Sequence, residues 1–279
     1  RNCEWGGVLT SNRFHGVLGS YSLVQISNEL LLTAREYGKK NAIRYRYFCL
    51  LSGQDYLLQN VEDINGQLEK AYPRPYIDCT PWAKGNWVDA GSHNCCWFMK
   101  IDKEITKRMP KVSLKRKIIK APFVIANRIF RNKMNVKQRF ACNKVDLYGG
   151  SAWWILPDDM IDCILEINKE WGKSCKFYPL IYTLVPEETY YQTLLMNSPY
   201  KNRVTVNPPD MVQQNCKTYA NFSSEGKNFT GHPYTLTMSD TKKLKELSST
   251  KFFARKFDDN VDSDVFDWID QNLLNHKVR

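Results

Sequence analysis

The sequence of 279 residues has no apolar run near the length of about 20 residues that a membrane-spanning helix needs. No signal peptide is visible at Arg1-Asn2-Cys3, and there is no initiator methionine, so we expect a trimmed or incomplete start. Zinc-finger spacing is missing too. Cys95-Cys96 with His93 is a poor ligand arrangement, and no second cysteine pair follows at a suitable interval, which excludes a zinc finger.

Acidic residues are missing from one long internal stretch. Residues 107–139 contain twelve lysines and arginines and no aspartate or glutamate. The net charge of the whole chain is +11, so the charges outside this stretch nearly cancel. The basicity therefore belongs to one local arm, which we place at residues 106–140, and polyanion binding by the whole surface is not implied.

The basic arm also carries apolar residues among its cations, namely Ile118, Ile119, Phe123, Val124, Ile125, Ile129 and Phe130. This pattern predicts a helical hairpin that lies on an anionic membrane surface. A basic face exposed to solvent explains the same residues, and both interpretations stay open. Nucleic acid is not an expected partner, because no recognised nucleic-acid-binding motif accompanies the cations.

The rest of the chain has the composition of a globular protein, with 43% hydrophobic and 13% aromatic residues. Its length suits one large α/β domain or two small ones. Apolar residues spaced three or four apart predict a helix over 23–37 that Gly38 ends, and 45–51 is typical of a buried strand. Further helices are expected to begin near Asn60, Pro157 and Asp240.

Two adjacent carboxylates, Glu187 and Glu188, stand at a predicted junction between a strand and a helix. Residues 177–184 are mostly apolar and predict a buried strand, and Pro186 suits the first position of a helix. Acidic side chains are favoured at the positive end of a helix, which would make the pair purely structural. Ligands of α/β sheets also bind at such junctions, which makes the pair a candidate for acid–base chemistry.

Two glycine-containing turns are further candidates for ligand binding. Gly53 and Asp55 follow the predicted strand 45–51, so the turn places a carboxylate at the edge of a sheet, although an ordinary turn has the same residues. Gly149-Gly150-Ser151 allows the backbone to approach a ligand closely. It leads into Trp153-Trp154, which begin another predicted strand.

Charged pairs elsewhere point to an anion more than to a metal. Arg255 and Lys256 lie between phenylalanines, a frame that suits clamping a diphosphate. Asp158-Asp159 and Asp262-Ser263-Asp264 have the letters of divalent-metal motifs. Both stand where a helix begins, so capping is the better explanation and we expect no metal site.

Five motifs in one order resemble the branching glycosyltransferase family, which includes core-2 and I-branching β-1,6-N-acetylglucosaminyltransferases and peptide O-xylosyltransferases. They are residues 51–56, 150–154, 185–188, 197–199 and 254–258, and the resemblance runs from about residue 12 to about residue 275. It implies a single glycosyltransferase domain over 1–279 with a GT-A fold. That fold is an α/β, Rossmann-like, mostly parallel mixed sheet flanked by helices, and its first strand has no match here.

The resemblance also implies roles for individual residues. Glu188 is the implied base for the acceptor hydroxyl, and Lys256, with Arg255 beside it, binds the donor diphosphate. A second family cation falls near His232, for which His232 or Lys227 is the expected substitute. The donor sugar and nucleotide are implied to face Gly53, Asp55 and Ser151. The acceptor cleft is implied to include Trp153, Trp154 and Glu187, the last in a mainly structural role.

The expected function is therefore inverting transfer of N-acetylglucosamine or xylose from a UDP-sugar to a hydroxyl of a glycan or peptide, with no metal cofactor. A non-catalytic carbohydrate-binding or inactive relative that uses the same cleft is the alternative, and a membrane-docked scaffold is a third. The cysteines number nine, an odd count, and Cys49 and Cys163 lie in apolar segments. These features favour free thiols in a reducing compartment. We therefore expect a cytoplasmic protein that is peripheral at a membrane, or a Golgi lumenal protein if the chain is a trimmed eukaryotic enzyme.

Overall fold

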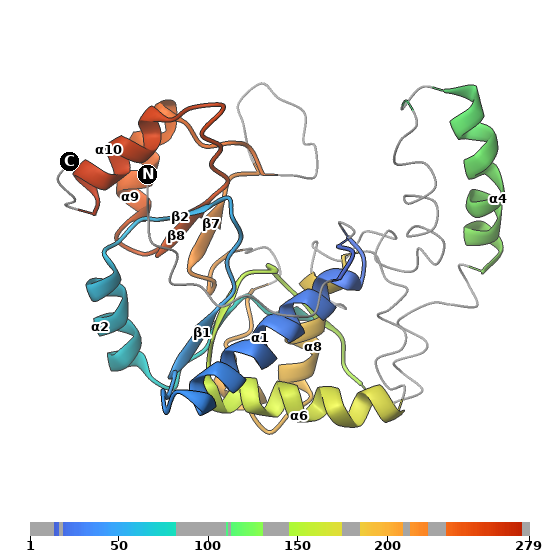
Figure 1. Cartoon of the computed structure of the whole chain (residues 1–279), viewed down its shortest axis with the longest axis horizontal. Helices are drawn as coiled ribbons and strands as arrows, with labels where there is room; N and C mark the ends of the chain where they lie inside the picture. The colour runs from blue at the N-terminus through green and yellow to red at the C-terminus, as the bar shows by residue number, and fades with distance from the viewer. Residues whose placement is uncertain are drawn as a thin grey trace.

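The computed structural model describes residues 14–16, 19–81, 110, 113–130, 145–174, 185–208, 213–222 and 233–274. Within these ranges, helices surround three small sheets (Figure 1). The α-helices are α1 (Ser22–Lys40), α2 (Val61–Ala71), α4 (Leu114–Phe130), α6 (Asp158–Ser174), α8 (Tyr190–Met196), α9 (Thr241–Leu247) and α10 (Asp264–Asn272). The short 3-10 helices are η2 (Pro186–Glu188), η3 (Lys201–Arg203) and η4 (Met238–Asp240).

The strands are short, and most of them pair antiparallel. They are β1 (Tyr47–Cys49), β2 (Asp55–Leu57), β3 (Tyr76–Ile77), β4 (Thr80–Pro81), β5 (Tyr148–Gly149), β6 (Trp154–Pro157), β7 (Thr218–Ala220) and β8 (Phe253–Arg255). The sheets have the orders β1-β6-β3, β2-β8-β7 and β4-β5. Among the described strands only β7 and β8 run parallel.

The expected mostly parallel sheet is therefore corrected to small, mostly antiparallel sheets in a mixed α/β protein. Continuous apolar runs are typical of strands buried on both faces, and this pattern led to the parallel interpretation. Such runs do not specify which neighbour a strand takes. Here β6 takes β1 and β3 as antiparallel neighbours, with Phe48 opposite Leu156 and Ile77 opposite Trp154. The predicted strand 177–184 lies outside the described residues.

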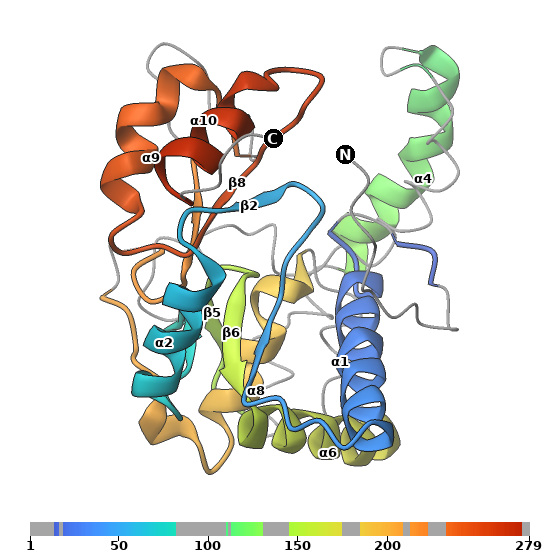
Figure 2. The same ribbon diagram turned by 60° about the vertical axis from the view of Figure 1, so that its left-hand side comes forward.

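The larger hydrophobic core lies between the β1-β6-β3 sheet and the helices α1, α6 and α8 (Figure 1, Figure 2). Met160, Ile161 and Ile164 of α6 are fully buried there. Residues 190–195 of α8 are all buried, because this short helix is covered on every side. A helix enclosed in this way holds the turn that precedes it, η2, in a fixed position.

A second core lies under the β2-β8-β7 sheet. Its buried side chains come from the strand β8 and from α9 and α10, and include Ala254, Leu244 and Ile269. A third, smaller cluster contains Ile155 of β6 and Phe252 beside β8, so it joins the two sheets. The residues next to β6 and β8 are thereby held near one another.

Several predicted helix boundaries are confirmed. Asn60 is the N-cap of α2, and Asp262 accepts hydrogen bonds from the first N–H groups of α10. Pro186 begins η2, a 3-10 turn that α8 follows as a separate helix. Helix α1 continues to Lys40, past the predicted end at Gly38. A side chain at Gly38 would come within 2.8 Å of the Ile43 carbonyl oxygen, so this glycine serves a close approach and does not end the helix.

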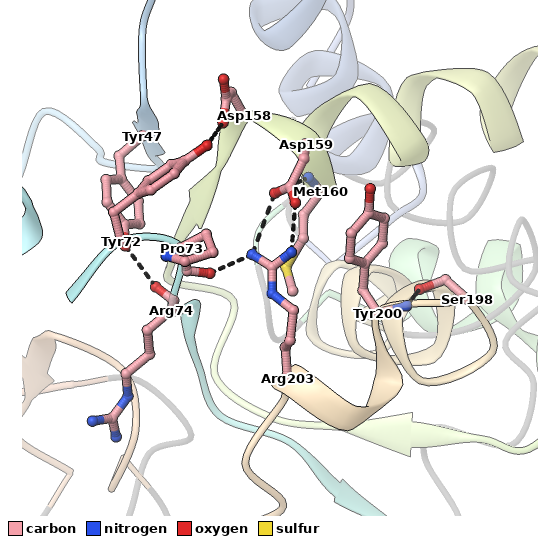
Figure 3. A network of polar contacts seen from close by, with 10 residues as sticks. All are labelled: Tyr47, Tyr72, Pro73, Arg74, Asp158, Asp159, Met160, Ser198, Tyr200 and Arg203. Atoms are coloured by element: carbon pink, nitrogen blue, oxygen red, sulfur yellow. Dashed lines mark hydrogen bonds and ion pairs between the residues drawn. The ribbon is translucent and has the colours of Figure 1, made fainter.

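Asp158 and Asp159 lie in the first turn of α6, as predicted, and Asp159 Oδ1 accepts a hydrogen bond from the Met160 N–H (2.9 Å) (Figure 3). Both carboxylates also bind residues far away in the chain. The Asp158 carboxylate accepts a hydrogen bond of 2.7 Å from the Tyr72 hydroxyl and lies 3.3 Å from Arg44 Nε. Asp159 forms an ion pair with Arg203 of η3. In the described ranges, no three histidine, cysteine or acidic side chains are grouped to hold a metal ion.

Helix α4 stands apart from the sheets in both views (Figure 1, Figure 2). None of its described side chains belongs to the three hydrophobic clusters. Most of the basic arm around it lies outside the described residues. No helix among the described residues combines the length and the apolar character that crossing a membrane requires.

The four cysteines in the described ranges are free thiols, which agrees with the predicted absence of disulfides at Cys49 and Cys163. Cys79 and Cys216 are fully buried. Burial raises the pKa of both thiols above the usual range. These two side chains therefore behave as small apolar groups.

Candidate active site

The turn that carries Glu188 is fixed through its backbone. Val185 has φ of 54°, a left-handed conformation that a β-branched residue rarely adopts, and its N–H donates to the Gly19 carbonyl (3.0 Å). The Gly150 N–H donates to the Glu188 carbonyl (2.9 Å). Residues in such strained conformations cluster at functional sites, where the surrounding structure holds them. Glu188 is therefore set between the start of α1 and the segment before β6.

Gly150 is required by a close approach to protein, and not to a ligand as its sequence context predicted. A Cβ at this position would lie 1.9 Å from the Asp78 carbonyl oxygen. Asp78 is itself 2% exposed, and its Oδ1 accepts hydrogen bonds from Asn207 Nδ2 (2.9 Å) and the Asn215 N–H (2.8 Å). Gly150, which holds the Glu188 turn, thus packs against a buried polar network around Asp78. The sequence did not predict this network.

Gln192 is a second residue that sequence reasoning missed. It is fully buried, and its Nε2 donates to the Ser151 carbonyl oxygen (2.8 Å). It lies in α8, the helix that follows the Glu188 turn, and no local sequence signal marked it. Gln192 joins α8 to the Ser151 segment and so gives the candidate base and that segment a common support.

Asp55 and Arg255 form a buried pair across two strands. They are directly opposite in the β2–β8 ladder, and Arg255 Nε lies 3.2 Å from Asp55 Oδ1 at an angle that does not make a hydrogen bond. Their side chains are 1% and 16% exposed, respectively. Ser52 also holds the Asp55 carboxylate, because its N–H (2.8 Å) and its Oγ (3.0 Å) donate hydrogen bonds to it.

Burial acts on both members of this pair. It raises the pKa of Asp55, against the hydrogen bonds from Ser52 and the charge of Arg255. It lowers the pKa of Arg255, against the charge of Asp55. Both shifts reflect desolvation, and a desolvated charge interacts more strongly with any charge that enters the site.

The guanidinium of Arg255 also packs on Trp153. Its Cζ lies 4.0 Å from the centre of a Trp153 ring, which is a close cation–π contact. Trp153 is half-buried, and Trp154 next to it is 2% exposed and packs against Tyr191. Trp153 precedes β6, whereas Trp154 is the first of four buried β6 residues and faces the core. A role for Trp154 in the acceptor cleft stays a prediction, and Trp153 is the tryptophan of the pair that is partly exposed.

Lys256 follows Arg255 at the end of the same strand. The next residue, Phe257, donates its N–H to the Gln54 carbonyl (2.9 Å), which ties this segment to the Gly53 turn. Gly53 has open space where a side chain would be. In the part of the chain that the structure describes, the Lys256 ammonium has no hydrogen-bond or ion-pair partner. The expected substitutes for a further cation, Lys227 and His232, lie outside the described residues.

One series of contacts connects four of the five sequence motifs. It runs from the Glu188 turn through Gly150 and Ser151 to Trp153, and from Trp153 through Arg255 to Asp55. The arrangement places a carboxylate turn, an aromatic ring and a paired cation along one connected path. Glu187 lies in the same turn as Glu188 and is partly exposed.

Comparison with known proteins identifies a family. Residues 17–247, well over half of the chain, match the family model described as core-2/I-branching enzyme. The chain belongs to the core-2/I-branching enzyme family. The motifs at Asp55, Ser151 and Glu188 lie within the matched residues, whereas Arg255 lies beyond residue 247, where the match ends.

Among curated proteins, this core-2/I-branching family member is similar to xylosyltransferase 2 of dog (Canis lupus familiaris) and of rat (Rattus norvegicus). Each is 27% identical to it over 130 residues. The matched part is 45% of this chain and 15% of each relative. The chain thus corresponds to a small part of the curated relatives it matches.

Proposed function

We propose that this protein is an inverting glycosyltransferase that moves N-acetylglucosamine or xylose from a UDP-sugar to a hydroxyl of a glycan or peptide. The observation that carries the proposal is the connected path from the Glu188 turn to the Asp55–Arg255 pair. Family membership supports glycosyl transfer, and the similarity to xylosyltransferase 2 supports xylose as one of the two donors. We further infer that the whole domain follows the GT-A arrangement of this family.

Glu188 is the proposed base. Inversion in one displacement needs a single group that accepts the proton of the acceptor hydroxyl as that oxygen attacks the anomeric carbon. The bond from the anomeric carbon to the diphosphate oxygen breaks in the same step, and UDP leaves with the electron pair. The fixed backbone of Glu188 suits this role because a base must be held within hydrogen-bond reach of its proton.

Lys256 and Arg255 are proposed to stabilise the leaving diphosphate, in different ways. Arg255 already shares its charge with Asp55, so its guanidinium is oriented before the donor arrives. Lys256 is the cation that brings uncompensated charge. The apolar frame of Phe252, Phe253 and Phe257 lowers the local dielectric, so the contact strengthens as the leaving oxygen gains charge.

Trp153 is proposed to line the donor and acceptor side of the site. Its ring is held by Arg255 on one face and is half-exposed overall. The C–H groups of a sugar pack on such aromatic surfaces. Ser151 and Gly53 complete the proposed donor surface, and Glu187 supports the turn beside the acceptor.

The experiment that tests the proposal measures UDP release by the purified chain from UDP-N-acetylglucosamine and from UDP-xylose. We expect release with one of them, and the same rate in excess EDTA because fixed cations stabilise the diphosphate. Loss of activity in EDTA with recovery in manganese would overturn the metal-independent part of the proposal. Binding of UDP-sugar without any turnover would favour the non-catalytic carbohydrate-binding alternative.

A further inference from the structure

Helix α4 exposes four large aliphatic side chains among its described residues. Leu114 is 74% exposed, Ile118 64%, and Val124 and Ile125 are each 58% exposed. By contrast, the aliphatic residues Ile161 and Ile164 of α6 are fully buried. Exposed aliphatic side chains gathered on one element mark an interaction surface.

The exposed residues of α4 are arranged by the geometry of the helix. At about 100° per residue, Leu114, Ile118 and Ile125 fall within about 40° of one another and form one stripe. Arg116 and Lys120 fall on the opposite side of the helix by the same count. No acidic residue occurs anywhere in 107–139, so nothing in this sequence stretch offsets the positive charge.

The surroundings of α4 do not cover this stripe with a described hydrophobic cluster. Leu114, Ile118 and Ile125 belong to none of the three clusters, and the helix stands away from the sheets (Figure 1, Figure 2). Among the described residues, the stripe is therefore a candidate contact surface for a partner that rewards apolar contact and positive charge together.

We propose that α4 lies flat on an anionic lipid surface. In this arrangement the Leu114–Ile118–Ile125 stripe enters the boundary between headgroups and acyl chains, while the lysines and arginines contact lipid phosphates and carboxylates. A nucleic acid would reward the cations but gain nothing from three exposed aliphatic side chains, so lipid fits the helix better. This inference is independent of the proposed enzymatic function, because α4 is separate from the Glu188 site.

The test is co-sedimentation of the full chain with vesicles of phosphatidylcholine alone and with vesicles that contain phosphatidylserine. Binding is expected only to the anionic vesicles and is expected to weaken as salt rises, because exposed charges are screened. Reversing two exposed lysines in Lys115→Glu/Lys117→Glu should weaken the partition by about thirty-fold or more, at about 1 kcal/mol per charge near the surface. The matched control is Lys242→Glu/Lys245→Glu on α9, which should bind as the unmodified protein does.

The apolar half of the proposal has its own variants. Ile118→Ser/Ile125→Ser should weaken binding to anionic vesicles by at least tenfold, while Val61→Ser on α2, which is also exposed, should not. Unchanged thermal unfolding would show that the α4 variants remain folded, since all four positions are exposed. Equal binding to neutral and anionic vesicles, or full binding by Ile118→Ser/Ile125→Ser, would overturn the proposal. So would binding to an RNA homopolymer with none to vesicles.

Discussion

The position of Glu188 is set by the backbone of its turn. The left-handed Val185 before it, and the hydrogen bond from the Gly150 N–H, fix the backbone from which its side chain extends. The neighbouring Glu187 lies in the same 3-10 turn and is partly exposed, as Glu188 is. The two residues therefore form a natural matched pair for testing which carboxylate performs proton transfer.

Replacing Glu188 with glutamine keeps the shape of the side chain and removes its ability to accept a proton. We expect Glu188→Gln to lower kcat by roughly two to four orders of magnitude, the usual contribution of a positioned base. Affinity for UDP should be unchanged, because the base does not hold the diphosphate. Steady-state kinetics with the active donor measures the effect, and Glu187→Gln is the control. An inactive Glu187→Gln beside an active Glu188→Gln would reverse the assignment.

At the scale of elements, the segment before β6 packs closely against the backbone at Asp78. A methyl group at Gly150 would lie 1.9 Å from the Asp78 carbonyl oxygen, which is a backbone atom that cannot move alone. We expect Gly150→Ala to lower the free energy of unfolding by about 1–3 kcal/mol. It should also lower kcat, because the Gly150 N–H holds the Glu188 carbonyl.

The matched control for this prediction is another glycine with free space around it. Gly66 lies inside α2, and a methyl group there would meet nothing within 4 Å. Gly66→Ala should therefore raise the free energy of unfolding by about 0.5–1 kcal/mol, since alanine restricts the unfolded helix segment. Denaturant unfolding measures the free energy of unfolding of both variants. Equal stability of Gly150→Ala and the unmodified chain would show that the backbone relaxes freely at Asp78.

The start of α6 makes stability depend on pH. Burial raises the pKa of Asp158, but hydrogen bonds from Tyr72 and Arg44 lower it by more, so its pKa lies below the usual range. A lowered pKa stabilises the folded state above the unfolded pKa of about 3.9. This stabilisation is lost as the pH falls through the lower, folded value.

Asp158→Asn should therefore lower the free energy of unfolding by about 1 kcal/mol at pH 6 and make its decrease between pH 5 and pH 3 shallower. Tyr72→Phe removes one hydrogen bond and keeps the carboxylate. Its plot of unfolding free energy against pH should therefore lie between those of the unmodified chain and Asp158→Asn. Thermal unfolding across this pH range measures the effect. A curve for Asp158→Asn that is as steep as that of the unmodified chain would contradict it.

At the scale of the whole molecule, the features that the sequence predicts best are local ones. Pro186 marked the start of its turn and Asn60 the start of α2, because a cap depends on residues within one helical turn. The motifs at Asp55 and Arg255 were identified separately, and the structure shows that they pair. Their pairing depends on strand register, which two separate segments determine together.

The features that could not be predicted depend on residues far apart in the chain. Asp159 lies 44 positions from its partner Arg203, and Asp158 lies 86 positions from Tyr72, so capping was the only partner visible locally. The strand directions were wrong because an apolar run records burial and not its neighbour. Trp153 and Trp154 were indistinguishable in sequence, since two adjacent tryptophans do not reveal which of them begins the buried strand.

The central claim is that this chain holds a nucleoside diphosphate against Lys256, and calorimetric titration with UDP tests it most directly. Lys242→Ala on α9 is the control for a lost surface charge, and Glu188→Gln for an altered site that keeps the cation. We predict that UDP binds the unmodified chain and both controls alike, and that Lys256→Ala weakens binding at least about tenfold, the size of one charged hydrogen bond. No binding of UDP by the unmodified chain, or equal binding by Lys256→Ala, would contradict the account.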